Sequence, residues 1–183
     1  MPHAMQSLIF TLGHSTRAIQ TFIDLLKSNR ITLVADIRSI PRSRHNPQFN
    51  KDVLPDELAG SGIGYEHMPG LGGLRHVLAG SRNGGWRNSS FRGFADYMQT
   101  AEFETALNSF IGIASMAVTT LMCAEALPWR CHRSLIADAL TIRGIEVEHI
   151  MGPGKLLRHT LTPWADVQGT TLQYPPPRDS GRR

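Results

Sequence analysis

The chain has 183 residues, of which 41% are hydrophobic and 19% are charged, a composition typical of one globular domain with enough apolar side chains to form a core. Its formal net charge of +4 favours an anionic partner, such as a nucleotide, a phosphorylated metabolite or nucleic acid. No stretch approaches the roughly 18–20 continuous apolar residues of a membrane span, residues 1–7 lack a secretory pattern, and two cysteines do not make a disulfide scaffold. We therefore expect a cytoplasmic protein with no membrane association.

Strand-like and helix-like patterns alternate along the chain. Apolar runs rich in β-branched residues predict strands, and apolar residues spaced three and four apart predict helices. In chain order the pattern reads strand 8–12, helix 19–26, strand 31–35, helix 55–59, strand 64–68, helix 103–114, strand 117–122, helix 135–140 and a final strand 146–150. This alternation predicts a single α/β domain whose mostly parallel sheet of about five strands carries helices on both faces.

Two segments depart from this alternation. Residues 69–92 are rich in Gly, Ser, Asn and Arg and have no periodic pattern, which is typical of a functional lid or of a disordered segment. Arginines and aromatics interleave between Trp86 and Phe94, and this suits either stacking on a nucleic-acid base or packing of the loop's own aromatics. We place the α/β domain at residues 1–151. Residues 152–183 are predicted to be a Pro/Arg-rich arm that packs on the domain and ends in disorder.

In open parallel sheets, ligands bind beyond the carboxyl ends of the strands, so the residues that follow each strand are the candidates for a site. The first predicted strand runs into Gly13-His14-Ser15-Thr16. Glycine allows close backbone approach, and Ser15 or Thr16 is expected at a helix N-terminus, where free N–H groups favour an anion. The alternative is a simple glycine turn with a capping residue, although capping does not require His14.

The second predicted strand runs into Asp36, Arg38 and Arg42. Alternation along an extended chain places Asp36 and Arg38 on the same side, so they can form an ion pair or orient each other beside a ligand. Arginine suits bidentate binding of phosphate or carboxylate, whereas the alternative is a solvated loop. Asn46 begins a polar and aromatic stretch that suits contact with a ring.

The fourth predicted strand is followed by the richest segment, residues 123–133. Cys123 and Glu125 leave the strand, and Cys131 opens the next helix. A cysteine at a helix N-terminus beside cations is expected to have a lowered pKa. Arg133 and Ser134 could instead bind an anion at the same helix end. The alternative is a buried structural cysteine followed by a polar helix start.

Several chemistries remain open at this segment. Cys131 could act as a nucleophile, with His14 or His132 as its proton partner. Glu125 could act as a general base beside arginines that hold the substrate. A metal site from both cysteines and a histidine, a disulfide between Cys123 and Cys131, and binding without catalysis are further alternatives, although the spacing Cys-x7-Cys is no zinc signature. The order strand–Cys–loop–Arg–helix loosely resembles phosphatase and sulfurtransferase loops, but the loop is not glycine-rich and Glu125 would repel an anion.

Six ordered motifs resemble a bacterial family catalogued as domain of unknown function 488. They are Gly-His-Ser-Thr (13–16), Asp-x-Arg-Ser-x-Pro-Arg-Ser (36–43), Asn-Pro-Gln-Phe-Asn (46–50), Leu-Gly-Gly (71–73), Phe-Arg-Gly-Phe-Ala-Asp-Tyr-Met (91–98) and Met-Cys-Ala-Glu-x-x-Pro-x-x-Cys-His-Arg (122–133). The resemblance runs from about residue 9 to 150, and Thr-Pro-Trp-Ala (162–165) is similar to the family's tail. It implies a small intracellular α/β protein with no settled activity, cofactor or catalytic role.

The convergence of polar strand ends leads to one main hypothesis and two alternatives. The main hypothesis is a small enzyme that binds a phosphorylated or nucleotide-like anion. Arg38, Arg42 and Arg133 would hold anionic groups, Glu125 and His14 would transfer protons, and Cys131 would be a nucleophile. Further ligand contacts are expected from Ser15, Thr16, Asp36, Asn46 and His132. The alternatives are a non-catalytic nucleic-acid-binding module and a thiol redox or sulfur-handling protein using Cys131. We predict no metal site, and no cofactor is specified.

Overall fold

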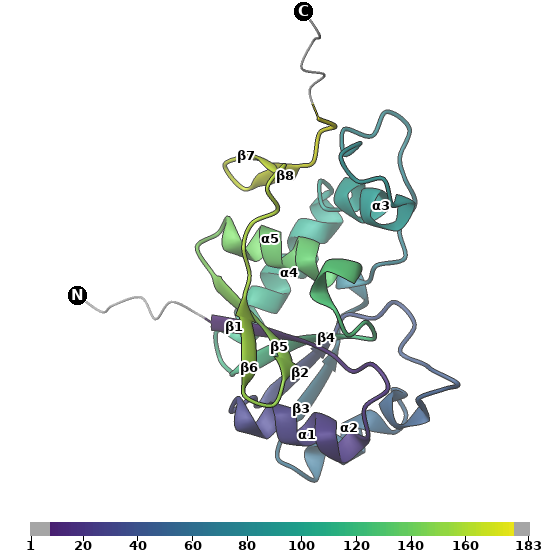
Figure 1. Ribbon diagram of the computed structural model, residues 1–183, viewed down its shortest axis with the longest axis vertical. Helices are drawn as coiled ribbons and strands as arrows, with labels where there is room; N and C mark the ends of the chain where they lie inside the picture. Colours follow the sequence, from purple (N-terminus) through teal and green to yellow (C-terminus); the bar gives the residue numbers. More distant parts are fainter. Residues whose placement is uncertain (1–7, 178–183) are drawn as a thin grey trace, which may run out of the picture.

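Six strands build the main sheet of this protein, whose computed structural model describes residues 8–177. They are β1 (Leu8–Gly13), β2 (Leu33–Asp36), β3 (Gly64–His67), β4 (Thr119–Cys123), β5 (Glu146–Gly152) and β6 (Lys155–Arg158), in the spatial order β3-β2-β4-β1-β5-β6 (Figure 1). The first five pair in parallel and β6 pairs antiparallel with β5. The carboxyl ends of β2, β4 and β1 therefore lie side by side at one edge of the sheet.

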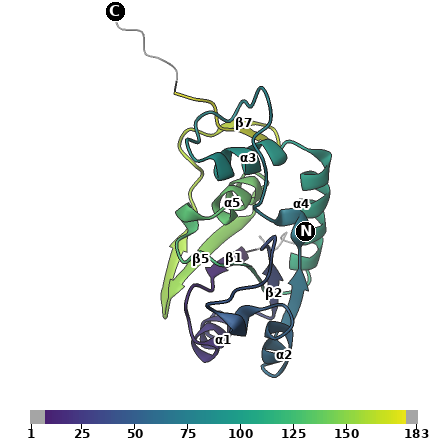
Figure 2. The same ribbon diagram turned by 90° about the vertical axis from the view of Figure 1, so that its right-hand side faces the viewer.

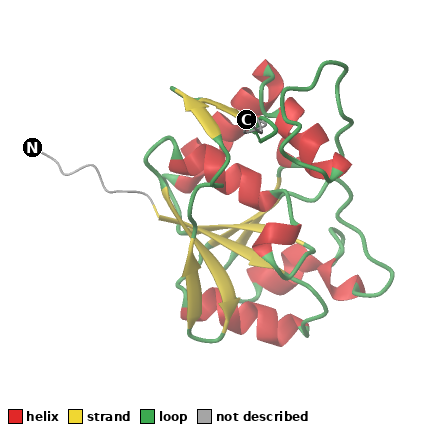
Figure 3. Ribbon diagram, turned by 45° about the horizontal axis from the view of Figure 1, so that its top comes forward, coloured by secondary structure: helices red, strands yellow, loops and turns green. Residues whose placement is uncertain are grey.

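Helices cover both faces of this sheet (Figures 2 and 3). One face carries α1 (Ile19–Ser28) and α2 (Leu54–Ala59), and the other carries α3 (Ser89–Tyr97), α4 (Ala101–Ala114) and α5 (Arg133–Thr141). Short 3-10 turns are η1 (Pro47–Phe49), η2 (Pro69–Leu71) and η3 (Pro128–Arg130). A small hairpin of β7 (Asp166–Gln168) and β8 (Thr171–Gln173) lies on the side of α3 and α5 (Figure 1).

Two hydrophobic clusters fill the space between the sheet and its helices. Because successive side chains of a strand point to opposite faces, the neighbours Ile9 and Phe10 of β1 belong to different clusters. Phe10 packs with α1 and α2, whereas Ile9 packs with α3, α4 and α5. The predicted α/β class, with a mostly parallel sheet and helices on both faces, is confirmed.

Residues 146–150 form a strand as predicted, within β5, but the prediction that this strand is the final one is wrong. The chain turns at Gly152-Pro-Gly154, where Gly154 adopts a φ of 63°, and returns as β6. Every residue of β6 is exposed, including Leu156 and Leu157 at 44% and 43%. An edge strand with no buried face has no apolar alternation, so the sequence carries no periodic signal for it.

The segment after β6 contacts the helical face that carries α3, α4 and α5. Leu172 and Tyr174 are buried in the cluster on that face. The sheet continues without a break through the predicted boundary between residues 151 and 152, because β6 pairs with β5. The predicted terminal disorder concerns residues 178–183, which lie outside the described residues.

The loop between η2 and α3 is packed against α3 and the C-terminal segment. The carboxylate of Asp96 accepts hydrogen bonds from three groups of this loop, Leu78 N, Ser81 Oγ and Asn83 Nδ2, at 2.9, 2.6 and 2.7 Å. Trp86 contacts three aromatic rings, those of Phe91, Trp164 and Tyr174. Of the two expectations for the aromatics here, packing within the domain is therefore the one that the structure shows. Among residues 8–177, no helix is both long and apolar enough to cross a bilayer.

Candidate functional site

Two neighbouring pockets open at the carboxyl edge of the sheet. The first, the polar pocket, has a volume of about 380 Å³ and receives residues from three strand ends: His14, Ser15 and Thr16 after β1, Arg38, Ile40, Arg42, Ser43 and Asn46 after β2, and Ala124, Glu125 and Ala126 after β4. The second, the cysteine pocket, has a volume of about 470 Å³ and is lined by groups that include Leu74, Phe91, Arg130, Cys131 and His132. Arg38, Ile40 and Glu125 line both pockets.

The end of β1 approaches the loop that follows β4 (residues 124–127, the β4 loop) too closely for any side chain at residue 13. A Cβ atom on Gly13 would lie 1.7 Å from the carbonyl oxygen of Glu125. The next two amides continue the contact, since His14 N donates to Cys123 O and Ser15 N donates to Ala124 O, both at 2.9 Å. The close backbone approach expected at this glycine is confirmed, and it aligns the two strand ends that form the polar pocket.

Ser15 and Thr16 are not at a helix N-terminus, so that expectation is wrong. Helix α1 begins at Ile19, and its N-cap is Ala18, which makes no side-chain capping bond. Ser15 instead adopts a left-handed backbone conformation with a φ of 50°. The residues after β1 are used to turn the chain across the sheet edge, and both hydroxyl side chains line the polar pocket without a helix dipole behind them.

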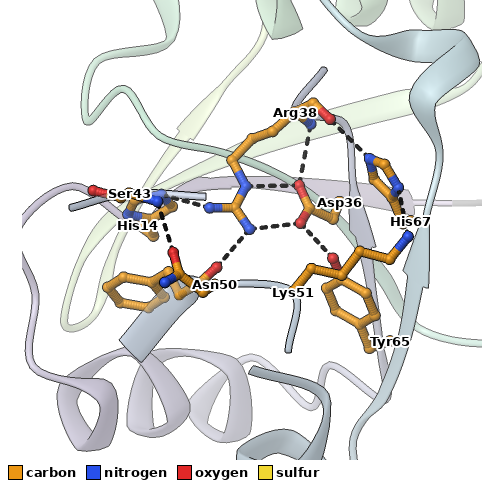
Figure 4. A network of polar contacts seen from close by, with 9 residues as sticks. His14, Asp36, Arg38, Ser43, Asn50, Lys51, Tyr65 and His67 are labelled. Carbon is orange, nitrogen blue, oxygen red and sulfur yellow. Dashed lines mark hydrogen bonds and ion pairs between the residues drawn. The ribbon is translucent and has the colours of Figure 1, made fainter. Parts of the chain in front are cut away.

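Asp36 and Arg38 form a buried, bidentate ion pair (Figure 4). Arg38 Nε donates to Asp36 Oδ1 at 2.9 Å and Nη2 donates to Oδ2 at 2.7 Å, with Asp36 fully buried and Arg38 7% exposed. Arg38 Nη2 also donates to Phe49 O at 2.7 Å, and Tyr65 Oη donates to Asp36 Oδ2 at 2.6 Å. Of the two expectations for this pair, the ion pair is confirmed. Asp36 lines neither pocket and acts by holding Arg38.

His14 supports the same arginine (Figure 4). Its Nδ1 lies 2.8 Å from Ser15 O, so Nδ1 carries the proton, and Nε2 accepts from Arg38 Nη1 at 3.3 Å. The ring stacks on Phe49 with centroids 4.2 Å apart. Burial, reinforced by the charge of Arg38, lowers the pKa of His14 to about 4. The His14 ring is neutral and both of its nitrogens are hydrogen-bonded, so the ring holds Arg38 in position. This geometry does not favour the proton transfer that we expected of His14.

Arg133 lies beneath the site rather than in it. The side chain is fully buried and lines neither pocket, which differs from its expected contact with an anionic ligand. It donates to Cys123 Sγ at 2.7 Å, to Ala126 O at 2.8 Å and to Thr11 Oγ1 at 3.2 Å, and it also bonds Glu125 O. Arg133 therefore fixes the β4 loop from below.

The two cysteines lie in contact, with their Sγ atoms 2.7 Å apart, and both are buried. The expected lowering of the pKa of Cys131 is wrong, because burial and the neighbouring Cys123 raise it well above its usual value. Burial also acts to raise the pKa of Cys123, but the hydrogen bond from Cys131 and the charge of Arg133 outweigh burial and lower that pKa to about 7. The acidic thiol is the one on the strand, not the one at the helix start.

His132 lines the cysteine pocket, and Glu125 lines both pockets. His132 Nε2 donates to Leu71 O at 3.0 Å, which leaves the Nδ1 lone pair facing Cys131 Sγ at 3.6 Å. Burial lowers the pKa of His132 to about 4.

Glu125 and Arg42 are exposed, and within residues 8–177 neither side chain has a hydrogen-bond or ion-pair partner. They are the charged groups of the polar pocket that remain free for a ligand.

A buried chain of hydrogen-bonded side chains, here called the relay, lies behind Arg133 and was not predicted from the sequence. The tautomer of each histidine is assigned from its hydrogen-bond partners, and all the hydrogen bonds then run in one direction. Thr11 Oγ1 donates to His149 Nδ1, His149 Nε2 donates to His159 Nδ1, and His159 Nε2 donates to an Asp138 carboxylate oxygen, at 2.7, 3.0 and 2.8 Å. These residues come from three elements and a loop, up to 138 residues apart. The available signal was a histidine and an aspartate inside otherwise apolar core elements.

Lowering the pH from about 6.5 towards 4 is expected to destabilise the fold. Burial lowers the pKa of His14 and His132 to about 4 and that of His149 to about 3, against 6.5 in an unfolded chain. The unfolded state therefore binds more protons in this window, and stability falls by up to about 1.4 kcal/mol per pH unit for each histidine. Urea unfolding at pH 7, 6 and 5 measures the slope. His149→Gln should reduce it, whereas replacing the exposed His76 by Gln should not.

Residues 8–177 contain no group of three or more His, Cys, Asp or Glu side chains that could hold a metal ion.

The comparisons with known proteins give a family and no further match. A search of curated proteins and a search of solved structures each found no match. The family model for Domain of unknown function DUF488 matches residues 18–140, which is more than half of the chain and includes five of the six motifs quoted above. The chain belongs to this family of domains of unknown function.

Proposed function

We propose that this protein is a small enzyme that binds a phosphorylated or nucleotide-like anion in the polar pocket. The observation that carries the proposal is the convergence of three strand ends on one pocket, where the parallel sheet directs its carboxyl edge to solvent. Arg38 and Arg42 both line this pocket. A fixed guanidinium beside a free one suits an anion, because the first is already oriented and the second can close on the ligand.

Hydroxyl and amide groups would complete the binding of the anion. Ser15 and Thr16 line the pocket on the β1 side, and Asn46 lines it on the β2 side. The cysteine pocket would take the remainder of an extended ligand, because Arg38, Ile40 and Glu125 are common to both pockets. A nucleotide or sugar phosphate has this bipartite form, with a charged end and a less charged body.

Glu125 is the proposed general base. Glu125 is exposed and lines both pockets, so it lies where the anionic end and the body of the ligand would meet. A carboxylate would accept a proton from a hydroxyl or a water molecule held by the neighbouring arginines. Asp36 and His14 act as positioning residues through Arg38 in this proposal, and Arg133 acts by supporting the loop that carries Glu125.

A thermal-shift and calorimetry screen with nucleoside monophosphates and sugar phosphates tests the binding. Arg42→Gln is expected to weaken the best ligand about 10–100-fold, as for a lost hydrogen bond to a charged group. The matched control is Arg44→Gln, since Arg44 is also exposed but does not line the pocket. Stabilisation by none of these compounds, or equal losses in the two variants, would contradict the proposal.

Glu125→Gln separates binding from turnover. Removing this charge is expected to leave binding of the anion intact or tighter, because the carboxylate repels it. Turnover of any substrate found by phosphorus NMR is expected to fall by about 10²–10⁴. Unchanged turnover would exclude Glu125 as the base.

The nucleic-acid-binding alternative is an outcome of the same experiments. It requires binding to DNA or RNA that falls steeply with salt. Such binding, with no effect of Arg42→Gln and no small-molecule ligand, would replace the enzyme proposal. The packing of Trp86 against the domain weakens this alternative, since that ring is not free to stack on a base.

A further inference from the structure

A pair of cysteines, to which the proposed function assigns no role, lies at the cysteine pocket that would hold the body of the ligand. Cys123 ends β4 and Cys131 precedes α5, and the fold brings their sulfur atoms to 2.7 Å. A disulfide bond is about 2.05 Å long, so these sulfurs can bond with little movement of the backbone. Both cysteines are free thiols in the structure.

We propose that Cys123 and Cys131 are a redox-active dithiol that exchanges with small-molecule disulfides entering the cysteine pocket. Cys131 lines that pocket, and Cys123 lies directly behind it, 2% exposed. The arrangement gives each sulfur a separate task. The outer sulfur, Cys131, meets the incoming disulfide, and the inner sulfur, Cys123, resolves the intermediate.

Charge and hydrogen bonding support this division. Arg133 Nη1 lies 2.7 Å from Cys123 Sγ, so the guanidinium stabilises a thiolate at the inner position. Cys131 can pass its proton to that thiolate across the 2.7 Å contact and so become the attacking thiolate itself, while His132 Nδ1 at 3.6 Å orients the thiol as a hydrogen-bond acceptor. The His132 ring is neutral near pH 7, because burial lowers its pKa to about 4, and its free lone pair faces the sulfur.

The exchange balances without any other reagent. The Cys131 thiolate attacks one sulfur of a disulfide RSSR, forms the mixed disulfide Cys131–S–S–R and releases one RS⁻. The released RS⁻ takes the proton of Cys123, and the Cys123 thiolate then attacks Cys131 Sγ, forms the intramolecular disulfide and releases the second RS⁻, which is protonated by solvent. In total, two protein thiols lose two electrons and two protons, and RSSR becomes two RSH.

The pocket selects a small disulfide over a protein disulfide. Its volume of about 470 Å³ is in the range of small-molecule sites, and Cys131 is recessed in it at 5% exposure. Arg130 and Arg38 on its walls would contact carboxylates of the incoming molecule. Glutathione disulfide has the required size, flexibility and carboxylate groups, and it is the probe for the test.

The test incubates the full chain with glutathione disulfide at pH 7.5, quenches by acid and counts thiols and mass adducts by mass spectrometry. The expected product is one intramolecular disulfide per chain, with two thiols lost and no glutathione retained, and reduced glutathione in excess should reverse it. Two unreacted thiols, a lasting glutathione adduct on the wild-type protein, or a disulfide between two chains would each overturn the proposal.

Two matched serine variants test the division of tasks. Cys123→Ser should stop at a stable glutathione adduct on Cys131, because no resolving sulfur remains. Cys131→Ser should stay unmodified, because the remaining sulfur is behind the pocket wall. The opposite pattern, with Cys123 modified and Cys131 inert, would reject the assignment. Circular dichroism establishes that each variant is folded, and the wild-type result decides the proposal if either is not. These outcomes are measured without a phosphate ligand, so they stand or fall separately from the ligand screen.

Discussion

Asp36→Ala is expected to destabilise the protein by about 3–5 kcal/mol, because it leaves the guanidinium of Arg38 buried without a counter-charge. Asp36 is fully buried and accepts from Arg38 Nε, Nη2 and the backbone N of the same residue. It also accepts from Tyr65 Oη, whose pKa is raised by burial and by this carboxylate. Urea unfolding at pH 7, with the slope against denaturant unchanged, measures the loss.

The partly exposed ion pair between Glu104 and Arg143 provides the control for this prediction. The Glu104 side chain is 46% exposed, so Glu104→Ala is expected to cost no more than about 1 kcal/mol. The double variant Asp36→Leu with Arg38→Met removes both charges and should be less destabilised than Asp36→Ala alone. Equal losses for Asp36→Ala and Glu104→Ala would show that the Asp36–Arg38 pair is not buried as described.

Gly13→Ala is expected to cost at least about 3 kcal/mol, although it adds a single methyl group. The new Cβ would lie 1.7 Å from the carbonyl oxygen of Glu125, and a backbone atom cannot move aside as a side-chain tip can. The β4 loop would have to shift, which breaks its bonds to Arg133 and to the amides of His14 and Ser15. The same variant should lose ligand binding in the polar pocket, because three of that pocket's lining residues move with the loop.

Gly112→Ala is the matched control. Gly112 is exposed on α4, and a Cβ added there would meet nothing within 4 Å. The substitution should stabilise the helix by about 0.5–1 kcal/mol, because alanine loses less backbone entropy than glycine on folding. Thermal and urea unfolding of both variants decide the matter. A loss below about 1 kcal/mol for Gly13→Ala would mean that the two strand ends are not in contact.

The strand ends were predictable from the sequence, whereas the roles of the residues on them were not. Periodic apolar runs locate β1, β2 and β4, and their polar followers include His14, Arg38 and Glu125, which line one pocket. The burial of individual side chains could not be predicted from the sequence, and it changes the role expected of several residues. Arg133 has the same sequence context as a ligand-binding arginine, but its guanidinium bonds Cys123 and two carbonyls of the loop beneath the site.

The cysteines illustrate the same limit. Helix-start position predicted an acidic Cys131, because the sequence shows Arg133 as its close neighbour. In the fold Arg133 points at Cys123 instead, and the first proton of the pair is lost there. The pKa of each thiol depends more on its distance in space to the Arg133 guanidinium than on its position in the chain, since a charge–charge interaction depends on separation and burial.

The sequence by itself determined the α/β class, the parallel sheet and the edge where the polar pocket opens, because apolar periodicity and polar strand ends are local signals. Only the tertiary structure decided which charges are free. Arg42 and Glu125 face solvent, while Asp36, Arg133 and the relay from Thr11 to Asp138 are buried and satisfied internally. It also added β6, whose exposed side chains carry no pattern. Pairing and burial arise from residues far apart in the chain, so no local pattern could predict them.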